Sequence, residues 1–184
     1  TNRTVFVLSR NCQGLTSLDL SFCEGIDDAA LRQLPVGFPL LRSLFLEEIP
    51  NLSATALAAL GGCHKLEELK LAYCAGTDDS VLAQLGQGCP MLRSVDLSNC
   101  PKITMPAVSD AVLRWPHLHT LALKGMATLT TQSFAHPELR RLVLSWSKNL
   151  EDPAINGIAQ GCPRLEDIDL AWCSKLTGNA VHKL

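Results

Sequence analysis

The sequence lacks a long apolar run, a cluster of basic residues and the zones of a signal peptide. No stretch of eighteen apolar residues is present, so no segment predicts a membrane-spanning helix. The formal net charge is only -2, and lysines and arginines are scattered along the chain, which disfavours nucleic acid and acidic membrane surfaces as partners. We therefore expect a soluble protein of the cytoplasm or nucleus that binds neither nucleic acid nor membrane.

Motifs for catalysis and for cofactor binding are also missing. The chain contains no G-x-G-x-x-G and no P-loop pattern. Its five histidines do not stand with an acid and a nucleophile in a way that predicts a catalytic triad. We expect no enzymatic activity, no catalytic residue and no cofactor.

A repeated leucine pattern dominates the sequence. The motif L-x-x-L-x-L, with Val or Ile in place of the middle leucine in two copies, starts at Leu15, Leu41, Leu66, Leu92, Leu118, Leu139 and Leu165. Successive copies are 25 or 26 residues apart, except that Leu139 follows Leu118 by 21 residues. A period kept over so many copies is typical of a stacked repeat protein.

Each copy of the motif predicts one short strand followed by one helix. The inner apolar pair, such as Leu18 and Leu20, alternates with other residues as in a half-buried strand. Seven residues after each pair stands a residue at which a helix should begin: Asp27, Ser53, Asp78, Thr104, Thr130, Glu151 or Thr177. The segment after Thr130 is five residues short, and His136-Pro137 leaves little room for a helix beyond Phe134.

Units of this size cannot close a core by themselves, because only neighbouring units cover the apolar face of each one. The predicted fold is therefore α/β, a leucine-rich-repeat solenoid (horseshoe) of about seven repeats, with a concave parallel β-sheet and convex helices. Residues 1–184 are expected to form a single solenoid. Thr1, Val5 and Leu8 match Thr177, Val181 and Leu184 in phase, so we expect the chain to be cut in mid-repeat at both ends.

The eight cysteines fall into two columns of the repeat. Cys12, Cys63, Cys89 and Cys162 occupy a slot that other repeats fill with Phe38, Trp115 or His136, and Cys23, Cys74, Cys100 and Cys173 occupy one filled elsewhere by Ile49, Met126 or Ser147. Replacement by large apolar residues indicates buried, reduced thiols. The C-x10-C spacing lacks the short cysteine pair of a structural zinc site, so no metal site is predicted. Ile49 and Met126 interrupt the second column, which disfavours a ladder of disulfides.

Two copies follow a longer motif, C-P-x-L-x-x-L-x-L-x-x-C-x-x-(I/L)-T, in residues 89–104 and 162–177, with Val95 and Ile168 at its second leucine position. This motif closely resembles the cysteine-containing leucine-rich repeats of F-box/LRR proteins, and the resemblance covers essentially the whole chain. In that family the repeats recognise a substrate protein, while an F-box outside them binds the Skp adaptor of a cullin-RING ubiquitin ligase.

The resemblance implies a non-catalytic protein-protein interaction module, the substrate-recognition part of an SCF-type ubiquitin ligase receptor. Skp adaptor and cullin would then bind only through a segment outside this chain. The alternative is a structural leucine-rich-repeat subunit of a larger axonemal or mitochondrial assembly.

The concave face is the predicted surface for a protein partner, because residues around and between the strand leucines point outward there. Four aromatic residues share the position two after the last strand leucine and would form a line along one edge, either as interface anchors or simply packed beside the loop. Acids outnumber bases on this face, which would steer a basic partner or merely keep the surface solvated. The candidate residues are Phe22, Phe45, Glu47, Glu48, Lys70, Tyr73, Asp96, Asn99, Lys124, Arg141, Trp146, Asp167, Asp169 and Trp172.

Overall fold

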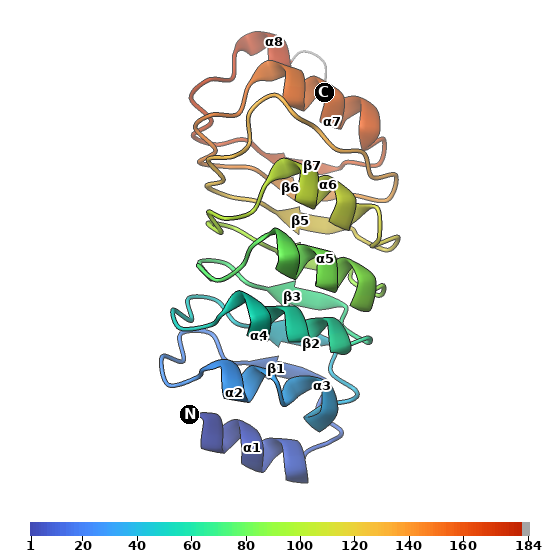
Figure 1. The fold of residues 1–184 in the computed structure, drawn as a ribbon. Helices are drawn as coiled ribbons and strands as arrows, with labels where there is room; N and C mark the ends of the chain where they lie inside the picture. The colour runs from blue at the N-terminus through green and yellow to red at the C-terminus, as the bar shows by residue number, and fades with distance from the viewer. Residues whose placement is uncertain (182–184) are drawn as a thin grey trace.

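Seven short parallel strands form one open sheet in the computed structural model, which describes residues 1–181 (Figure 1). The strands are β1 (Ser17–Asp19), β2 (Ser43–Phe45), β3 (Glu68–Lys70), β4 (Ser94–Asp96), β5 (Thr120–Ala122), β6 (Arg141–Val143) and β7 (Asp167–Asp169). They lie side by side in chain order, and the first leucine of each inner pair stays in register from Leu18 to Ile168. The predicted leucine-rich-repeat solenoid is confirmed.

Helices cover one side of this sheet in the described part of the chain (Figure 1). They are α1 (Asn2–Asn11), α2 (Asp28–Leu31), α3 (Leu34–Gly37), α4 (Ala54–Ala58), the 3-10 helix η1 (Ala59–Gly62), α5 (Asp79–Gly88), α6 (Met105–Val112), α7 (Asp152–Gly161) and α8 (Gly178–Val181). The side chains of Asp27, Ser53, Asp78 and Thr104 accept hydrogen bonds from backbone N–H groups in the first turn, as expected of N-caps. The predicted helix starts are therefore confirmed where such helices form. Leu184, used above for the phase of the chain, lies outside the described residues.

One predicted helix start is wrong. No helix follows Thr130, and the described residues 131–138 run without helical structure between β5 and β6. The physical reason is the missing five residues together with His136-Pro137, since proline cannot donate a helical hydrogen bond. Phe134 and His136 fill the space instead, and both are buried.

Neighbouring repeats are also joined by a polar contact at the helix starts. The Asp28 carboxylate accepts hydrogen bonds from the Ser53 backbone N–H and hydroxyl of the next repeat, at 2.8 and 2.6 Å. Asp79 holds Thr104 in the same way. The hydrogen bonds from Ser53 lower the pKa of Asp28 because they stabilise its charged form. This contact links the first turn of one helix to the N-cap residue of the next and so helps to fix the distance between them.

Burial is predicted for all eight cysteines, and six of them are buried. Burial raises the pKa of Cys63, Cys89 and Cys100 to about 12, because a thiolate there would lose its hydration. The prediction fails in part for Cys12 and Cys23, which are only half-buried. Both adjoin β1, the edge strand of the described sheet, so no preceding strand covers them.

The second cysteine column also explains why a thiol suits this slot. The thiols of Cys74, Cys100 and Cys173 each donate to a backbone carbonyl of the preceding repeat, at 3.0 to 3.2 Å. A compact, weakly polar group therefore fills the space and satisfies a carbonyl at the same time.

Candidate functional site

Each repeat turns at the same point, where one residue takes a left-handed backbone conformation. These residues are Phe22, Glu48, Tyr73, Asn99, Gly125, Trp146 and Trp172, with φ between 54° and 70°. For residues other than glycine, asparagine and aspartate this conformation costs roughly 1–2 kcal/mol. We name this set the left-handed column.

Backbone hydrogen bonds hold the left-handed column in place. The Tyr73 N–H donates to the Ser98 carbonyl of the next repeat at 2.9 Å, and the Trp146 N–H donates to the Ala171 carbonyl at 2.8 Å. The column residues from Phe22 to Trp146 thus each extend the sheet ladder by one bond, and the side chains of the column stand at the loop edge of the strand face. The position of these side chains is set by the repeat itself.

The aromatic members of the column stand largely in solvent. Phe22 is 65% exposed, Trp172 is 70% exposed, and Tyr73 and Trp146 keep about half of their surface in contact with water. The rings of Trp146 and Trp172 stack on each other, with centroids 5.0 Å apart and an angle of 21° between their planes. Exposed aromatic rings in a fixed row are a favourable binding surface, because Trp and Tyr bury much area at small entropic cost.

The strand face itself carries polar and charged residues that contact one another across strands. The Lys70 ammonium group lies 4.9 Å from the centroid of the Phe45 ring, and Arg141 forms an ion pair with Asp167 at 3.3 Å. These four predicted residues lie on β2, β3, β6 and β7. Their side chains are held by neighbours on the same face.

Several of the predicted acids serve the turn that follows each strand. The carboxylates of Asp19, Asp96 and Asp169 accept hydrogen bonds from the backbone N–H two residues later, at 2.9, 2.8 and 3.0 Å. The bond from Ser21 lowers the pKa of Asp19 below its usual value. Glu47 and Glu48, in contrast, accept no such bond among the described residues. The excess of acid on this face is thus partly structural.

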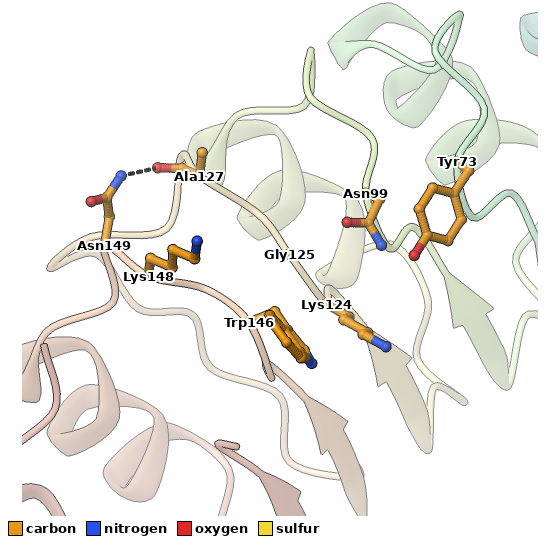
Figure 2. Close-up of a pocket in the computed structure, with 8 residues that line it drawn as sticks. All are labelled: Tyr73, Asn99, Lys124, Gly125, Ala127, Trp146, Lys148 and Asn149. Atoms are coloured by element: carbon orange, nitrogen blue, oxygen red, sulfur yellow. Dashed lines mark hydrogen bonds between the residues drawn. The ribbon is translucent and has the colours of Figure 1, made fainter. Parts of the chain in front are cut away.

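A cleft of about 620 Å³ opens between Tyr73 and Trp146 (Figure 2). Asn99 and Gly125, which occupy the two column positions between these aromatic residues, lie along it, and Lys124 also lines it. Glycine suits this position because of Asn99, since a Cβ added at Gly125 would stand 2.2 Å from the Asn99 side-chain oxygen. The cleft exists because two neighbouring repeats lack a large side chain in the column.

The structure brings together Tyr73, Asn99, Lys124 and Trp146 of the predicted set in this cleft. Phe22 lies in the first repeat and Glu48 in the second, away from it, and Trp172 lies beyond Trp146. Sequence reasoning missed the other lining residues Gly125, Ala127, Lys148 and Asn149. They stand at or just after the column position, in loops with no alternating pattern. The Asn149 amide donates to the Ala127 carbonyl at 3.0 Å, which joins two of these loops.

The cleft lining is electrically one-sided. Lys124 is half-buried and Lys148 is exposed, and the lining contains no acid. Neither lysine takes part in an ion pair with the described residues. Figure 2 shows them on opposite sides of Trp146, with Lys148 beside Ala127 and Asn149 and Lys124 toward Tyr73. This part of the surface is basic, although the strand face as a whole carries more acids.

Among residues 1–181, no group of three or more His, Cys, Asp or Glu side chains is arranged to hold a metal ion. None of the helices in the same range is both long and apolar enough to cross a membrane.

Comparison with known proteins finds similarity to leucine-rich-repeat sequences. Residues 11–34 match the family model described as Leucine Rich repeat. The chain is 29% identical over 168 residues to F-box/LRR-repeat protein 4 of Bos taurus, which covers 86% of this chain and 27% of that protein. It is 25% identical over 171 residues to F-box protein SKIP1 of Arabidopsis thaliana, covering 91% of this chain and 54% of that protein.

A third relative, BTB/POZ domain-containing protein FBL11 of Arabidopsis thaliana, is 35% identical over 101 residues, covering 54% of this chain and 11% of that protein. The chain thus spans about half of the length of one of these relatives and about a quarter or less of the other two. The similarity supports the resemblance to F-box/LRR-type repeats that the cysteine motif indicated.

Solved structures agree on the fold. A chain of the yeast Rad7 and Elc1 complex superposes with a TM-score of 0.53 at 16% identity, covering all of this chain and 64% of that one. A chain of the mouse RP105/MD-1 complex gives a TM-score of 0.58 at 19% identity, covering 91% and 32%. At these identities the likeness concerns the fold alone.

Proposed function

Because the chain is a leucine-rich-repeat solenoid similar in sequence to F-box/LRR-repeat proteins, we propose that it is a non-catalytic module that binds a protein partner. The partner would contact the strand face and the left-handed column. In the full protein, the module would act as the substrate-recognition part of an SCF-type ubiquitin ligase receptor in the cytoplasm or nucleus. Its mechanism would be positioning, with Skp adaptor and cullin bound through a segment outside this chain.

The left-handed column carries this proposal. Glycine or asparagine would adopt the left-handed conformation at little cost, yet four of the seven repeats place Phe, Tyr or Trp there. These side chains gain little from packing, because about half or more of each one is exposed. These aromatic residues adopt an unfavourable backbone conformation, remain exposed to solvent and lie in one row. Contact with a partner explains this combination best.

The binding surface is tested with the full-length protein and a double variant, Trp146→Ala with Trp172→Ala. Alanine pays a similar backbone cost, so the fold should be kept while the stacked aromatic surface is lost. The matched control is Val36→Ala with Leu113→Ala, because both residues are exposed apolar residues on the helix side. Partners identified by quantitative affinity purification should be lost from the tryptophan variant and kept by the control.

The ligase assignment is tested in the same purification. Skp adaptor and cullin should accompany the full-length protein in both variants, because neither change touches the segment that would bind them. Absence of both from the unaltered protein would rule out the ligase part of the proposal. Stable, stoichiometric recovery of a large complex without them would instead favour the structural subunit.

A further inference from the structure

The cleft interrupts an otherwise regular row of exposed side chains. Adjacent parallel strands lie about 4.8 Å apart, so the three steps from Tyr73 to Trp146 span roughly 14 Å. Between them the Asn99 side chain lies across Gly125, in the space that a larger residue would fill. The result is a gap of about 620 Å³ with a flat aromatic wall at each end. Such a gap accommodates one or two side chains of an incoming segment.

The charge of the cleft restricts the chemistry of those side chains. Lys124 and Lys148 line it, with no acid in the lining and no ion pair to any described residue. Their long flexible stems allow both ammonium groups to turn toward a ligand. A basic side chain in the cleft would meet two like charges beside a partly desolvated surface, which is unfavourable.

The second repeat, next to the Tyr73 side of the cleft, carries the opposite charge. Glu47 and Glu48 lie on the second repeat, on the far side of Tyr73 from the cleft. Acidic and basic residues are therefore separated along one edge of the solenoid. An acidic side chain of a partner segment would be attracted by the two lysines and repelled by the two glutamates. The charges would therefore favour one position of the segment along this edge.

We propose that the cleft binds an anionic side chain, either a carboxylate or a phosphomonoester, carried by an extended segment of the partner protein next to an apolar or aromatic residue. The anion lies near Lys124 and Lys148, and the neighbouring flat side chain packs against Trp146. The lining comes from four successive repeats, which suits an extended segment that runs along the edge. This inference rests on the proposed function, because it specifies the partner's chemistry at the same surface.

The test uses four synthetic peptides in one Gly/Ser frame, each with a central 5-fluorotryptophan followed by Glu, phosphoserine, Gln or Lys. Binding to the protein is followed by ¹⁹F NMR of the peptide, which detects weak complexes. The Glu and phosphoserine peptides should bind about fivefold or more tightly than the Gln peptide, and the Lys peptide should bind most weakly. Tighter binding of phosphoserine than of Glu would identify a phosphorylated segment, and equal binding would identify a carboxylate.

Two variants locate the interaction. Lys124→Gln with Lys148→Gln should remove the preference for the anionic peptides. Arg10→Gln with Lys65→Gln changes the net charge equally on exposed residues outside the cleft and should leave the preference intact. Asn99→Tyr should block all four peptides without a change of charge, since Tyr73 already adopts the same backbone conformation.

Three results would overturn the inference: equal binding of the Glu and Lys peptides, no binding of any peptide, or a lysine double variant that keeps the preference. Failure here remains distinct from failure of the proposed function. If partner capture depends on Trp146 and Trp172 while the lysine variant has no effect, only the charge inference fails. If capture is independent of the tryptophans, the proposed binding surface fails as well.

Discussion

The fourth and fifth repeats are neighbours, yet they cover the core in different ways. The fourth repeat (residues 92–117) places α6 over β4 and closes with Trp115, which is fully buried. The fifth repeat (residues 118–138) has no helix, and an extended segment brings Phe134 and His136 into the same layer. Trp115 and His136 occupy the same slot of the repeat. A helix is thus one way to cover the buried side of a strand, and an extended segment with two large side chains is another.

The next helix is adapted to the extended segment. A Cβ added at Gly161 of α7 would stand 2.8 Å from the Ala135 Cα, and one added at Gly157 would stand 2.1 Å from the Ser133 hydroxyl oxygen. The His136 side-chain Nε2 lies 3.0 Å from the Trp115 carbonyl, and its backbone N–H donates to Gly161 at 2.9 Å. The extended segment therefore packs closely against α7, as the 3-10 helix η1 does against α5, where a Cβ added at Gly88 would stand 1.9 Å from the Gly61 carbonyl oxygen. The short repeat also contributes Gly125, which opens the cleft at the opposite edge.

The largest expected difference between the two repeats is in alkaline stability. Cys89 and Cys100 flank β4, whereas Trp115 and Met126 occupy the corresponding slots on either side of β5. The pKa of both thiols is about 12 in the folded chain against an ordinary value of 9.0, so unfolding releases protons at high pH. Their contribution to stability is complete below pH 9 and is lost as the pH rises from 9 toward 12.

Urea unfolding followed by circular dichroism at pH 7 to 10.5 measures this effect. Each unit of pKa difference corresponds to on the order of 1 kcal/mol, so the midpoint should fall steeply above pH 9. A Cys89→Ala, Cys100→Ala variant should show a weaker dependence on pH, although it starts from a lower stability. An unchanged pH dependence in this variant would contradict the assignment to these thiols.

The sequence predicts the strands of all seven repeats and the helix starts of the regular repeats, because both follow from a repeated pattern. Leu44 and Leu69, for example, pair in register because each repeat presents the same inward leucine. The cleft could not be predicted in this way. It depends on the Asn99 side chain lying across Gly125 and on Lys148, which stands in a loop without periodic constraint. The close fit of Gly161 to Ala135 likewise depends on contacts between repeats.

Removing the large residue of the fourth repeat should cost more than changing its counterpart in the fifth. Trp115→Ala should lower the free energy of unfolding by about 3–5 kcal/mol, because it leaves a large cavity in the core. His136→Leu keeps most of the volume and loses the contact with the Trp115 carbonyl, so about 1–2 kcal/mol is expected. Urea unfolding at neutral pH compares the two. A larger loss for His136→Leu would show that the extended segment, and not α6, dominates this layer.

The glycines of the two helices should respond in opposite directions. Gly161→Ala pushes a Cβ into the backbone of the extended segment and should cost about 1–3 kcal/mol. A Cβ at Gly86 of α5 would stand 3.0 Å from the flexible Arg114 side chain and in ordinary contact with the Ala111 Cα at 3.6 Å. Gly86→Ala also gains helix propensity, so it should be neutral or stabilise by up to about 1 kcal/mol. Hydrogen exchange of residues 131–138 should rise only in the Gly161 variant. Equal effects of the two changes would mean that α7 is not specially fitted to the short repeat.

The smallest expected effect concerns Ser147, which follows the short repeat in the second cysteine column. Its side chain is fully buried, and its hydroxyl oxygen has no hydrogen-bond partner in the described part of the chain. The thiols of Cys74, Cys100 and Cys173 each reach a carbonyl from the same slot. Sulfur has a longer bond to carbon and costs less to bury than a hydroxyl.

Ser147→Cys should therefore raise the free energy of unfolding by about 0.5–1 kcal/mol. Ser147→Ala serves as the control, because it removes the unpaired hydroxyl without filling the slot and should gain less. The new thiol should also resist alkylation in the folded protein as Cys100 does. If Ser147→Cys lowers stability, then the sixth repeat differs in backbone position from the regular ones, and the effect of the short repeat extends beyond its own residues.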